Sequence, residues 1–596
     1  MRFKSPLIAI SAVGLLALSA CGGSGSSSGN AGDNTQDNTK LGDTGNGQDA
    51  TAKGPVTIAG AKKGGTVTVL TLNGLTTTID PSEIYYTDTD SIFTGLIGRS
   101  LTQYRYNPDT KQMVLVPDLA TDLGQHNDNY TQWKFTIRSG VKWGENGQPV
   151  TAKEVAWGMT RCMDVATFPT GACGYYSNVY FKGGSTYKGP YTEKQKPGTI
   201  FSGIKVNGNT ITINMSKPFP DMPYWGTFPA NGPVPTDPKV SDPKAYKKHP
   251  WSTGPYMIKS FSPAKELVLE KNPYWSASTD PARTQYPDGY DFKLQTQSEK
   301  IDQILLADSG SGQTTLTYDD LLAPDFQQLK QKDPSRLTLG GSPCTYYWAP
   351  DNRKITNKKV REALSWAYPY KNIILAGGLI PNVNAIPATN LMPPGLPGRT
   401  PYNVTGRQGF DTDPAKAKAL LKSANALGFE IKFLFRTDDP INVKSKDATV
   451  KALTEAGFKA TPVPTTTANY AAARDNTEED INVRSAGWCS DWPSGSTWLP
   501  TLFANTNPDK THSFGTNYST FTNKAVQNQM DAIQKMPLAD QADAWNQLDH
   551  TIAQKYFPLF TTYYTGIAQA HGSKIEGDFD DNTVGMPTWK NIWINQ

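Results

Sequence analysis

The sequence predicts a mixed α/β protein with more than one lobe. Segments with the two-residue alternation of β-strands and segments with the spacing of amphipathic helices both occur along the chain. In the second half they follow one another as strand, helix and strand, the order of a right-handed βαβ unit. The 596 residues, of which 37% are hydrophobic, suffice for about four domains of ~150 residues or for fewer large ones.

The first half of the chain contains four segments with clear local signals. Residues 65–70 alternate as a strand, and residues 131–141 are expected to form another. Thr151 and Glu154 have the spacing of a capping box, which predicts a helix from this point through Met163. Residues 204–213 predict a β-hairpin that turns around an Asn-Gly-Asn sequence.

The second half supplies the remaining predicted elements. Residues 358–367 and 414–426 have the spacing of amphipathic helices. Residues 430–435 predict a strand, the stretch near residues 447–457 predicts a helix, and residues 482–484 predict the next strand. These last three segments form the expected βαβ unit.

The N-terminus has the anatomy of a lipoprotein export signal. Arg2 and Lys4 precede an apolar run over residues 7–18, whose 12 residues are too few to span a bilayer comfortably. The run ends in Leu18-Ser19-Ala20-Cys21, which resembles a bacterial lipobox, in which the thiol accepts a diacylglycerol. We therefore expect a signal peptide over residues 1–20 and a lipidated Cys21. An ordinary signal whose cleavage point precedes a cysteine is the alternative.

A flexible tether is expected after Cys21. Residues 22–55 are rich in Gly, Ser, Asn, Asp and Thr, and Leu41 is their only large apolar residue. Such a segment cannot bury enough surface to offset its ordering entropy. We place the tether at residues 21–63, so the folded body is expected to sit outside the cell, anchored to the membrane by two acyl chains.

The cysteine count favours two disulfides. Lipidation uses Cys21, and an even four remain in an exported protein. Cys162 and Cys173 are close enough in the chain to close one loop, which leaves Cys344 and Cys489 to pair across a long stretch. Free buried thiols are the alternative.

Composition and missing motifs argue against several classes of protein. The net charge of +4 is too small for a nucleic-acid binder held by phosphate contacts. A mean hydropathy of −0.51 and a single long apolar run, at the N-terminus, exclude a polytopic membrane protein. The chain has no H-E-x-x-H motif, no Gly-Lys dipeptide and only five scattered histidines. We therefore expect a binding protein, not an enzyme, with no cofactor and no metal.

Several segments resemble one family of binding proteins. They are similar to the extracytoplasmic solute-binding proteins of bacterial ABC importers, specifically the oligopeptide/dipeptide-binding family (family 5) in its lipoprotein form. The matching segments, in the family's order, are residues 133–143 continuing through 147–155, residues 252–256, 267–275, 360–367 and 486–492.

The resemblance implies a two-lobed periplasmic-binding-protein-like fold (class II, large type), with a hinge and a subdomain inserted in lobe I. Lobe I would be assembled from residues 64–98, 224–340 and a C-terminal return at 557–596. The inserted subdomain would cover residues 99–223, and lobe II residues 341–556. Peptide-binding relatives carry a lobe II disulfide where Cys344 and Cys489 lie.

The resemblance also implies a peptide site. In peptide-binding relatives the Asp of the Trp-Cys-x-Asp segment pairs with the ligand's α-ammonium, and here this residue is Asp491; a turn or N-cap acid is the alternative reading. Backbone groups of residues 487–489 would pair with the ligand as with an added strand. The ligand-binding set that we expect is Asp491, Trp488, Gly487, Cys489, Tyr85, Tyr86, Thr87 and, ranked lower, Tyr346, Tyr347 and Trp492.

One departure from the family concerns the loop after this segment. Relatives commonly continue Asp-aromatic-Pro with Asp-Pro, whereas Trp492-Pro493 here precedes Ser494-Gly495-Ser496. Ligand length and side-chain preference therefore stay open, and no residue can be assigned to the ligand's far end.

Three functions follow from this sequence, in descending order of support. The first is a monomeric binding protein that captures oligopeptides between two lobes and delivers them to the transmembrane subunits of an ABC permease. The second has the same fold but binds an oligosaccharide or another non-peptide solute, because aromatic walls also suit sugars. The third is a cell-surface hydrolase.

Overall fold

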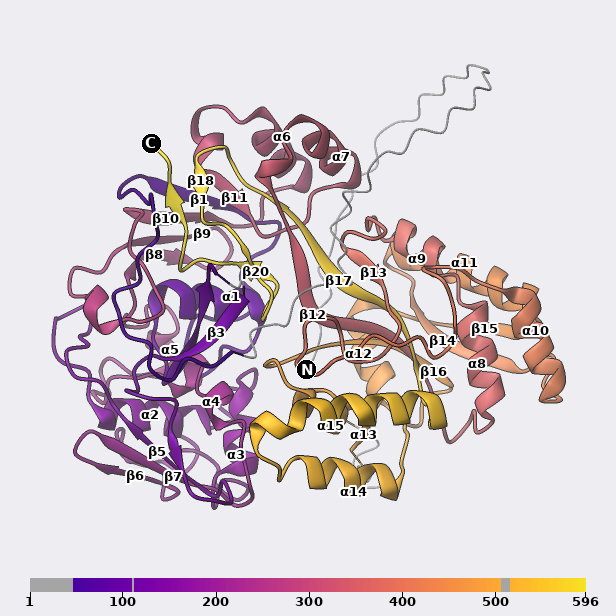
Figure 1. The fold of residues 1–596 in the computed structure, drawn as a ribbon, viewed down its shortest axis with the longest axis horizontal. Helices are drawn as coiled ribbons and strands as arrows, with labels where there is room; N and C mark the ends of the chain where they lie inside the picture. Colours follow the sequence, from indigo (N-terminus) through magenta and orange to yellow (C-terminus); the bar gives the residue numbers. More distant parts are fainter. Residues whose placement is uncertain (1–46, 110–111, 505–514) are drawn as a thin grey trace.

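The computed structural model describes residues 47–109, 112–504 and 515–596 and confirms the α/β class. Figure 1 shows two lobes: lobe I, in indigo and magenta on the left, and lobe II, largely in orange on the right. Each lobe is built around its own large β-sheet. The expected signal peptide, Cys21 and most of the expected tether lie outside the described residues.

Lobe I is built around a five-stranded sheet. Its order is β11 (Thr315–Thr317), β1 (Thr66–Leu70), β10 (Gly289–Lys293), β9 (Glu266–Lys271) and β8 (Tyr256–Ser262). β1 runs parallel to both of its neighbours, whereas β10, β9 and β8 are antiparallel. The predicted alternation in β1 is confirmed, because Val67 and Val69 are fully buried in the lobe I core. Helices α1 (Thr87–Ile92), α5 (Pro243–Tyr246), α6 (Ser298–Ala307) and α7 (Ala323–Lys332) belong to the same half of the chain.

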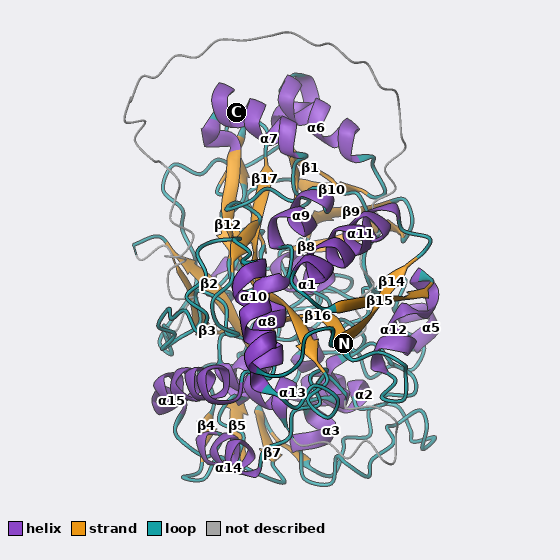
Figure 2. Cartoon of the chain, turned by 90° about the vertical axis from the view of Figure 1, so that its right-hand side faces the viewer, coloured by secondary structure: helices purple, strands orange, loops and turns teal. Residues whose placement is uncertain are grey.

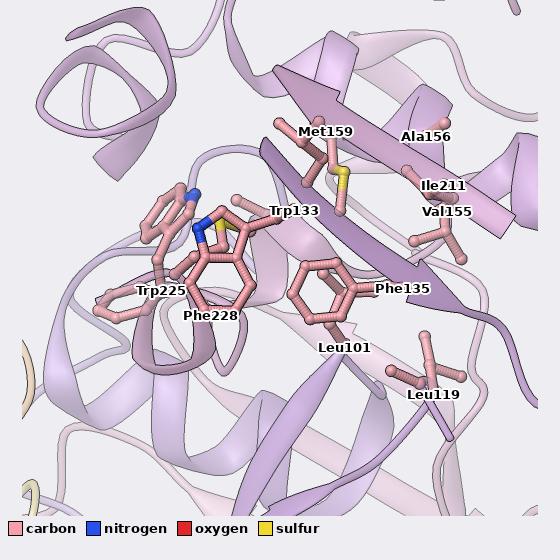
Figure 3. Packing of buried hydrophobic residues seen from close by; sticks show 14 of the residues in the cluster. Leu101, Leu119, Trp133, Phe135, Val155, Ala156, Met159, Ile211, Trp225 and Phe228 are labelled. Carbon is pink, nitrogen blue, oxygen red and sulfur yellow. The ribbon is translucent and has the colours of Figure 1, made fainter. Parts of the chain in front are cut away.

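The inserted region has a smaller sheet and one long helix. The sheet order is β4 (Gln125–His126), β5 (Gln132–Thr136), β7 (Thr210–Asn214) and β6 (Ile204–Asn207), so the predicted hairpin is confirmed. Helix α2 (Ala152–Cys162) has the predicted capping box, in which the Thr151 hydroxyl accepts from the Glu154 amide at 3.3 Å. Figure 3 shows how Trp133, Phe135 and Val155 share one core with residues of the hairpin. β2 (Thr102–Asn107) pairs with β3 (Gln112–Pro117), and short helices α3 (Ser177–Tyr180) and α4 (Met222–Trp225) complete this region.

The strand expected over residues 131–141 ends early. β5 stops at Thr136, after which the Arg138 amide donates to the Leu119 carbonyl at 2.7 Å, away from the sheet. Gly140 follows with a φ of +84°, a turn conformation that favours glycine. The apolar alternation therefore continues past the point at which the backbone leaves the sheet.

Lobe II is built around a six-stranded sheet. Its order is β13 (Ala385–Pro387), β17 (Phe560–Ala570), β12 (Leu337–Pro350), β16 (Val483–Cys489), β14 (Glu430–Arg436) and β15 (Lys459–Thr465). The helices of this half are α8 (Lys358–Ala367), α9 (Tyr370–Ala376), α10 (Pro414–Ser423), α11 (Pro440–Glu455), α12 (Thr467–Asp475), α13 (Leu499–Phe503), α14 (Lys524–Ile533) and α15 (Leu538–Thr551). The predicted strand–helix–strand order is present, but β15, which was not expected, follows α11 and pairs with β14 in parallel.

Two long strands connect the lobes. β12 and β17 lie side by side, with pairing that runs from Leu337–Ala570 in lobe I to Trp348–Phe560 in lobe II, as Figures 1 and 2 show from two directions. The pairing register shifts between Gly341 and Thr345. Beyond β17 the chain joins lobe I, where β18 (Ile575–Glu576) pairs with β21 (Trp593–Ile594) and β19 (Asp580–Asp581) with β20 (Met586–Pro587).

Both predicted disulfides are confirmed. Cys162 at the end of α2 is bonded to Cys173, and Cys344 on β12 is bonded to Cys489, directly opposite on β16. The second bond ties together two neighbouring strands of lobe II, and so it holds the end of β16 in place.

Residues 47–63, which fall within the expected tether, contact lobe I. Asp49 forms an ion pair with Arg105 at 3.2 Å, and Ala52 is buried against Val116. No helix among the described residues is both long and apolar enough to cross a bilayer.

Candidate functional site

The candidate site is centred on Asp491, which follows β16 and faces lobe I. The disulfide at Cys489 fixes the strand end, and the Ser490 amide donates to the Pro343 carbonyl at 2.9 Å. The Asp491 carboxylate is thereby held at the boundary between the lobes.

Two tyrosines of lobe I donate hydrogen bonds to the Asp491 carboxylate. The Tyr85 hydroxyl donates to Oδ1 at 2.9 Å, and the Tyr176 hydroxyl donates to Oδ2. Burial raises the pKa of Asp491 to about 6, although both phenol hydrogen bonds oppose this rise. The site therefore contains an acid that is mostly ionised at pH 7 and ready to accept a cation.

Tyr176 owes its position to the shorter disulfide. It lies three residues after Cys173, and its ring packs against Trp225 at 4.9 Å and Trp492 at 4.6 Å between ring centroids. Sequence reasoning missed this residue, because the only available signal was its nearness to Cys173.

The loop after Asp491 anchors lobe II to lobe I. Trp492 is only 2% exposed and packs in the core of the inserted region, with Phe219 and Phe228 at 6.3 Å. The Ser496 hydroxyl donates to Asp221 of lobe I at 2.7 Å. The departure from the family noted at residues 494–496 therefore contributes a contact between the lobes.

A cavity lies beside Asp491 and is lined by lobe I residues together with Asp491 and Trp492 of the loop after β16. Four aromatic residues line it: Tyr104, Phe228, Trp492 and Trp589. Four ionisable residues line it as well: Asp90, Asp491, Asp581 and Lys590. This mixture of aromatic and charged groups is typical of a small-ligand site.

The charged groups of this cavity have shifted pKa values. Burial raises the pKa of Asp90 to about 7, with Lys590 opposing the rise, and it also raises the pKa of Asp581. Burial lowers the pKa of Lys590 to about 8, with Asp581 opposing the fall. Such clusters of perturbed groups in a cleft are characteristic of functional sites.

The edge of β16 that faces away from β12 has a strand partner only at its start, and the Tyr470 hydroxyl donates to the Ser485 carbonyl at 3.5 Å. Tyr346 pairs with Gly487 on one side, but β14 pairs with β16 only between Phe433 and Val483. Within the described parts of the chain, no strand pairs with residues 485–489 on that second edge. An extended ligand could therefore add to this edge as a strand.

The structure brings together only part of the site that the sequence suggests. Tyr85, Asp491 and Trp492 meet at the boundary between the lobes. The Trp488 side chain instead lies in the lobe II core and donates to the Thr497 carbonyl at 2.8 Å. Tyr347 is also buried in that core.

The remaining expected residues lie on the surrounding surface. Tyr346 is 37% exposed and stacks on Tyr563 at 4.6 Å. Tyr86 is extended at the start of α1, of which exposed Thr87 is the first residue. The described residues contain no group of three or more His, Cys, Asp or Glu side chains suited to a metal ion.

Comparison with known proteins identifies the family of this chain. The family model described as bacterial extracellular solute-binding proteins, family 5 Middle, matches residues 114–510. The periplasmic oligopeptide-binding protein OppA of Salmonella typhimurium is 24% identical over 412 residues, which cover 65% of this chain and 69% of that protein.

Solved structures share the fold. The clavulanic acid biosynthesis oligopeptide binding protein 2 superposes with a TM-score of 0.77 at 21% identity, over 93% of this chain and 99% of that one. Listeria monocytogenes OppA bound to peptide gives a TM-score of 0.61 at 17% identity, over 90% and 99% of the two chains.

Proposed function

Because the chain belongs to the bacterial extracellular solute-binding proteins of family 5, we propose that it captures oligopeptides between its lobes for an ABC importer. The observation that carries this proposal is the Asp491 carboxylate on the wall of a cavity that lobe I residues largely line. The names of the relatives support the ligand class, since OppA of Salmonella typhimurium is an oligopeptide-binding protein.

The ligand's α-ammonium would bind Asp491. The hydroxyls of Tyr85 and Tyr176 donate hydrogen bonds to this carboxylate. An ammonium adds a full positive charge, so it forms a stronger, charge-assisted hydrogen bond than a phenol does. The second edge of residues 485–489, which no described strand covers, would then pair with the peptide backbone irrespective of sequence.

The lobes would close on the ligand by bending where β12 and β17 cross between them. The register shift between Gly341 and Thr345 interrupts the ladder at this point, which favours it as the hinge. The closed form would then dock on the transmembrane subunits of the permease.

Binding without chemistry is the proposed role, with no cofactor or metal, and the working unit is a monomer. We further propose that Cys21 carries a lipid that anchors the protein outside the cell. Changing Cys21 to Ser should release the protein from the membrane fraction. Unchanged membrane attachment of this variant would contradict the anchor while leaving the peptide proposal intact.

A non-peptide solute is the second candidate, favoured by the four aromatic residues of the cavity. Native mass spectrometry of the protein purified from its own host separates the two candidates. Co-purified masses that fragment as peptides are the expected result. Masses that fragment as sugars, together with no binding of added peptides, would overturn the peptide proposal.

A further inference from the structure

The ammonium of Lys590 lies at the wall of the cavity beside Asp491. Its Nζ donates to the Gln103 side-chain oxygen at 3.1 Å and to the Tyr104 carbonyl at 2.9 Å. Lys590 is only 6% exposed, and within the described ranges no carboxylate oxygen comes within 4.0 Å of this nitrogen. An ammonium has three N–H donors, so one donor is left for another acceptor.

Burying the Lys590 ammonium in this way reduces the stability of the fold unless a ligand pairs with it. A buried ammonium that makes no direct ion pair is destabilising even though the charges of Asp581, Asp118 and Asp90 partly offset its desolvation, and an anion in direct contact would offset it further. The lysine is also well held, since the Thr284 hydroxyl donates to its backbone carbonyl at 2.6 Å and the Trp589 indole donates to Ser91 at 3.2 Å. A buried cation that a rigid backbone holds at the wall of a cavity is preorganised to bind an anion.

The neighbouring acids do not occupy the free donor. Asp118 is engaged by Arg99 at 2.7 Å and Arg283 at 2.9 Å, and Asp581 accepts from the Thr583 amide at 3.2 Å.

Asp90 lies on the same cavity, and its Oδ1 is buried without a hydrogen-bond partner. With a pKa of about 7, it is half-protonated at neutral pH and can take up a proton when a second anion arrives.

We propose that Lys590 binds a carboxylate of the captured peptide. This inference rests on the proposed function and extends it: Asp491 and Lys590 would hold opposite charges of one ligand within one cavity. The carboxylate is either the C-terminus or an acidic side chain.

The experiment compares matched peptide pools. A library of tripeptides with free C-termini and the same library as C-terminal amides are offered to the wild type, and binding is detected by native mass spectrometry. The tightest binder is then titrated by calorimetry as free acid, as amide, and as an amide with glutamate at its last position. Lys590→Met removes the charge, and Lys574→Met is the matched control on an exposed lysine of the same C-terminal segment.

The wild type and Lys574→Met should bind the free acid about thirtyfold or more tightly than the amide, as expected for a buried charge pair. Lys590→Met should bind the two forms equally. If the glutamate amide binds as tightly as the free acid, Lys590 accepts a side-chain carboxylate; if it binds as weakly as the plain amide, Lys590 reads the C-terminus. Either result upholds the proposal.

Equal binding of all three forms by the wild type would overturn the role of Lys590 but leave peptide capture intact. If Lys590→Met instead keeps a preference of the wild type for peptides that contain arginine or lysine, the proposal is overturned, because the cavity would then bind cations through Asp90 and Asp581. Absence of binding by either pool would count against the proposed function itself. If thermal melts show that Lys590→Met does not fold, Lys590→Gln replaces it, and the wild-type comparison decides the question without any variant.

Discussion

The affinity for a peptide with a free N-terminus should fall about tenfold when the pH is lowered from 7 to 5. In the free protein burial raises the pKa of Asp491 to about 6. The carboxylate is therefore about 90% ionised at pH 7 and about 10% ionised at pH 5. Only the ionised form pairs with an ammonium, and apparent affinity scales with the competent fraction. The loss corresponds to about 1.4 kcal/mol of binding free energy.

Calorimetry with one peptide in its free and N-acetylated forms isolates this effect. Asp90, Asp581 and Lys590 titrate in the same cavity, but they influence both peptide forms. The ratio of the two affinities therefore reports on Asp491 alone. This ratio should fall about tenfold between pH 7 and pH 5 in the wild type and stay constant in Asp491→Asn. A ratio that does not change with pH in the wild type would refute the assignment of the ammonium to Asp491.

The same pKa shift predicts a change in the stability of the ligand-free protein. A carboxyl group whose pKa is raised on folding contributes stability that is present below its unfolded pKa and is lost as the pH rises through about 6. The rise in the pKa of Asp491 from 3.8 to about 6 corresponds to about 3 kcal/mol of folding free energy. From this we subtract about 1 kcal/mol for one phenol hydrogen bond that the variant loses. Asp491→Asn should therefore be about 2 kcal/mol more stable than the wild type at pH 7, measured by urea unfolding. A destabilised variant would contradict the desolvation cost that we infer for the buried Asp491 carboxylate.

Three further predictions concern the groups around Asp491. Tyr176→Phe removes a hydrogen bond that lowers the pKa of Asp491, so the midpoint of the pH dependence of peptide binding should move above 6; an unmoved midpoint would mean that this phenol does not matter. Trp492→Ala should lower the free energy of unfolding by about 3–5 kcal/mol in urea titrations, because it empties a buried site between the lobes; a loss below 1 kcal/mol would show that the site collapses without cost. Replacing Cys162 and Cys173 together by Ser should lower the free energy of unfolding by about 2–3 kcal/mol, as expected for a loop of 11 residues. Calorimetric melts of the oxidised wild type and the variant would test this. Equal melting temperatures would contradict it.

The elements that local signals in the sequence predicted are present in the structure, whereas many others, among them β12 and β17, were not predicted. The capping box at Thr151 fixed the start of α2, because its hydrogen bonds involve only neighbouring residues. β15 escaped prediction because Pro462 and Pro464 lack backbone donors, and they are tolerated since β15 is the edge strand of its sheet. Helix α11 begins earlier than expected, at Pro440, where the Asp439 side chain caps two amides.

The site was less accessible to sequence reasoning. The resemblance to a known family located Asp491 and Tyr85, and both do meet. Trp488 was ranked with Asp491 for its proximity, yet side chains alternate along a strand, and its side chain points into the core. Tyr176 and Lys590 come from segments distant from Asp491 in the sequence, so only the assembled fold brings Tyr176 to the Asp491 carboxylate and Lys590 to the cavity.

The position of β17 has a consequence for how this chain is made. β17 lies inside the lobe II sheet, between β13 and β12, although it begins only at Phe560. Lobe I likewise needs Trp589 and Ile594, which complete its hydrophobic core. A chain that is synthesised N-terminus first can therefore finish neither lobe until the segment from β17 to Ile594 has appeared. The order of the strands itself therefore delays the folding of both lobes until this late segment is available.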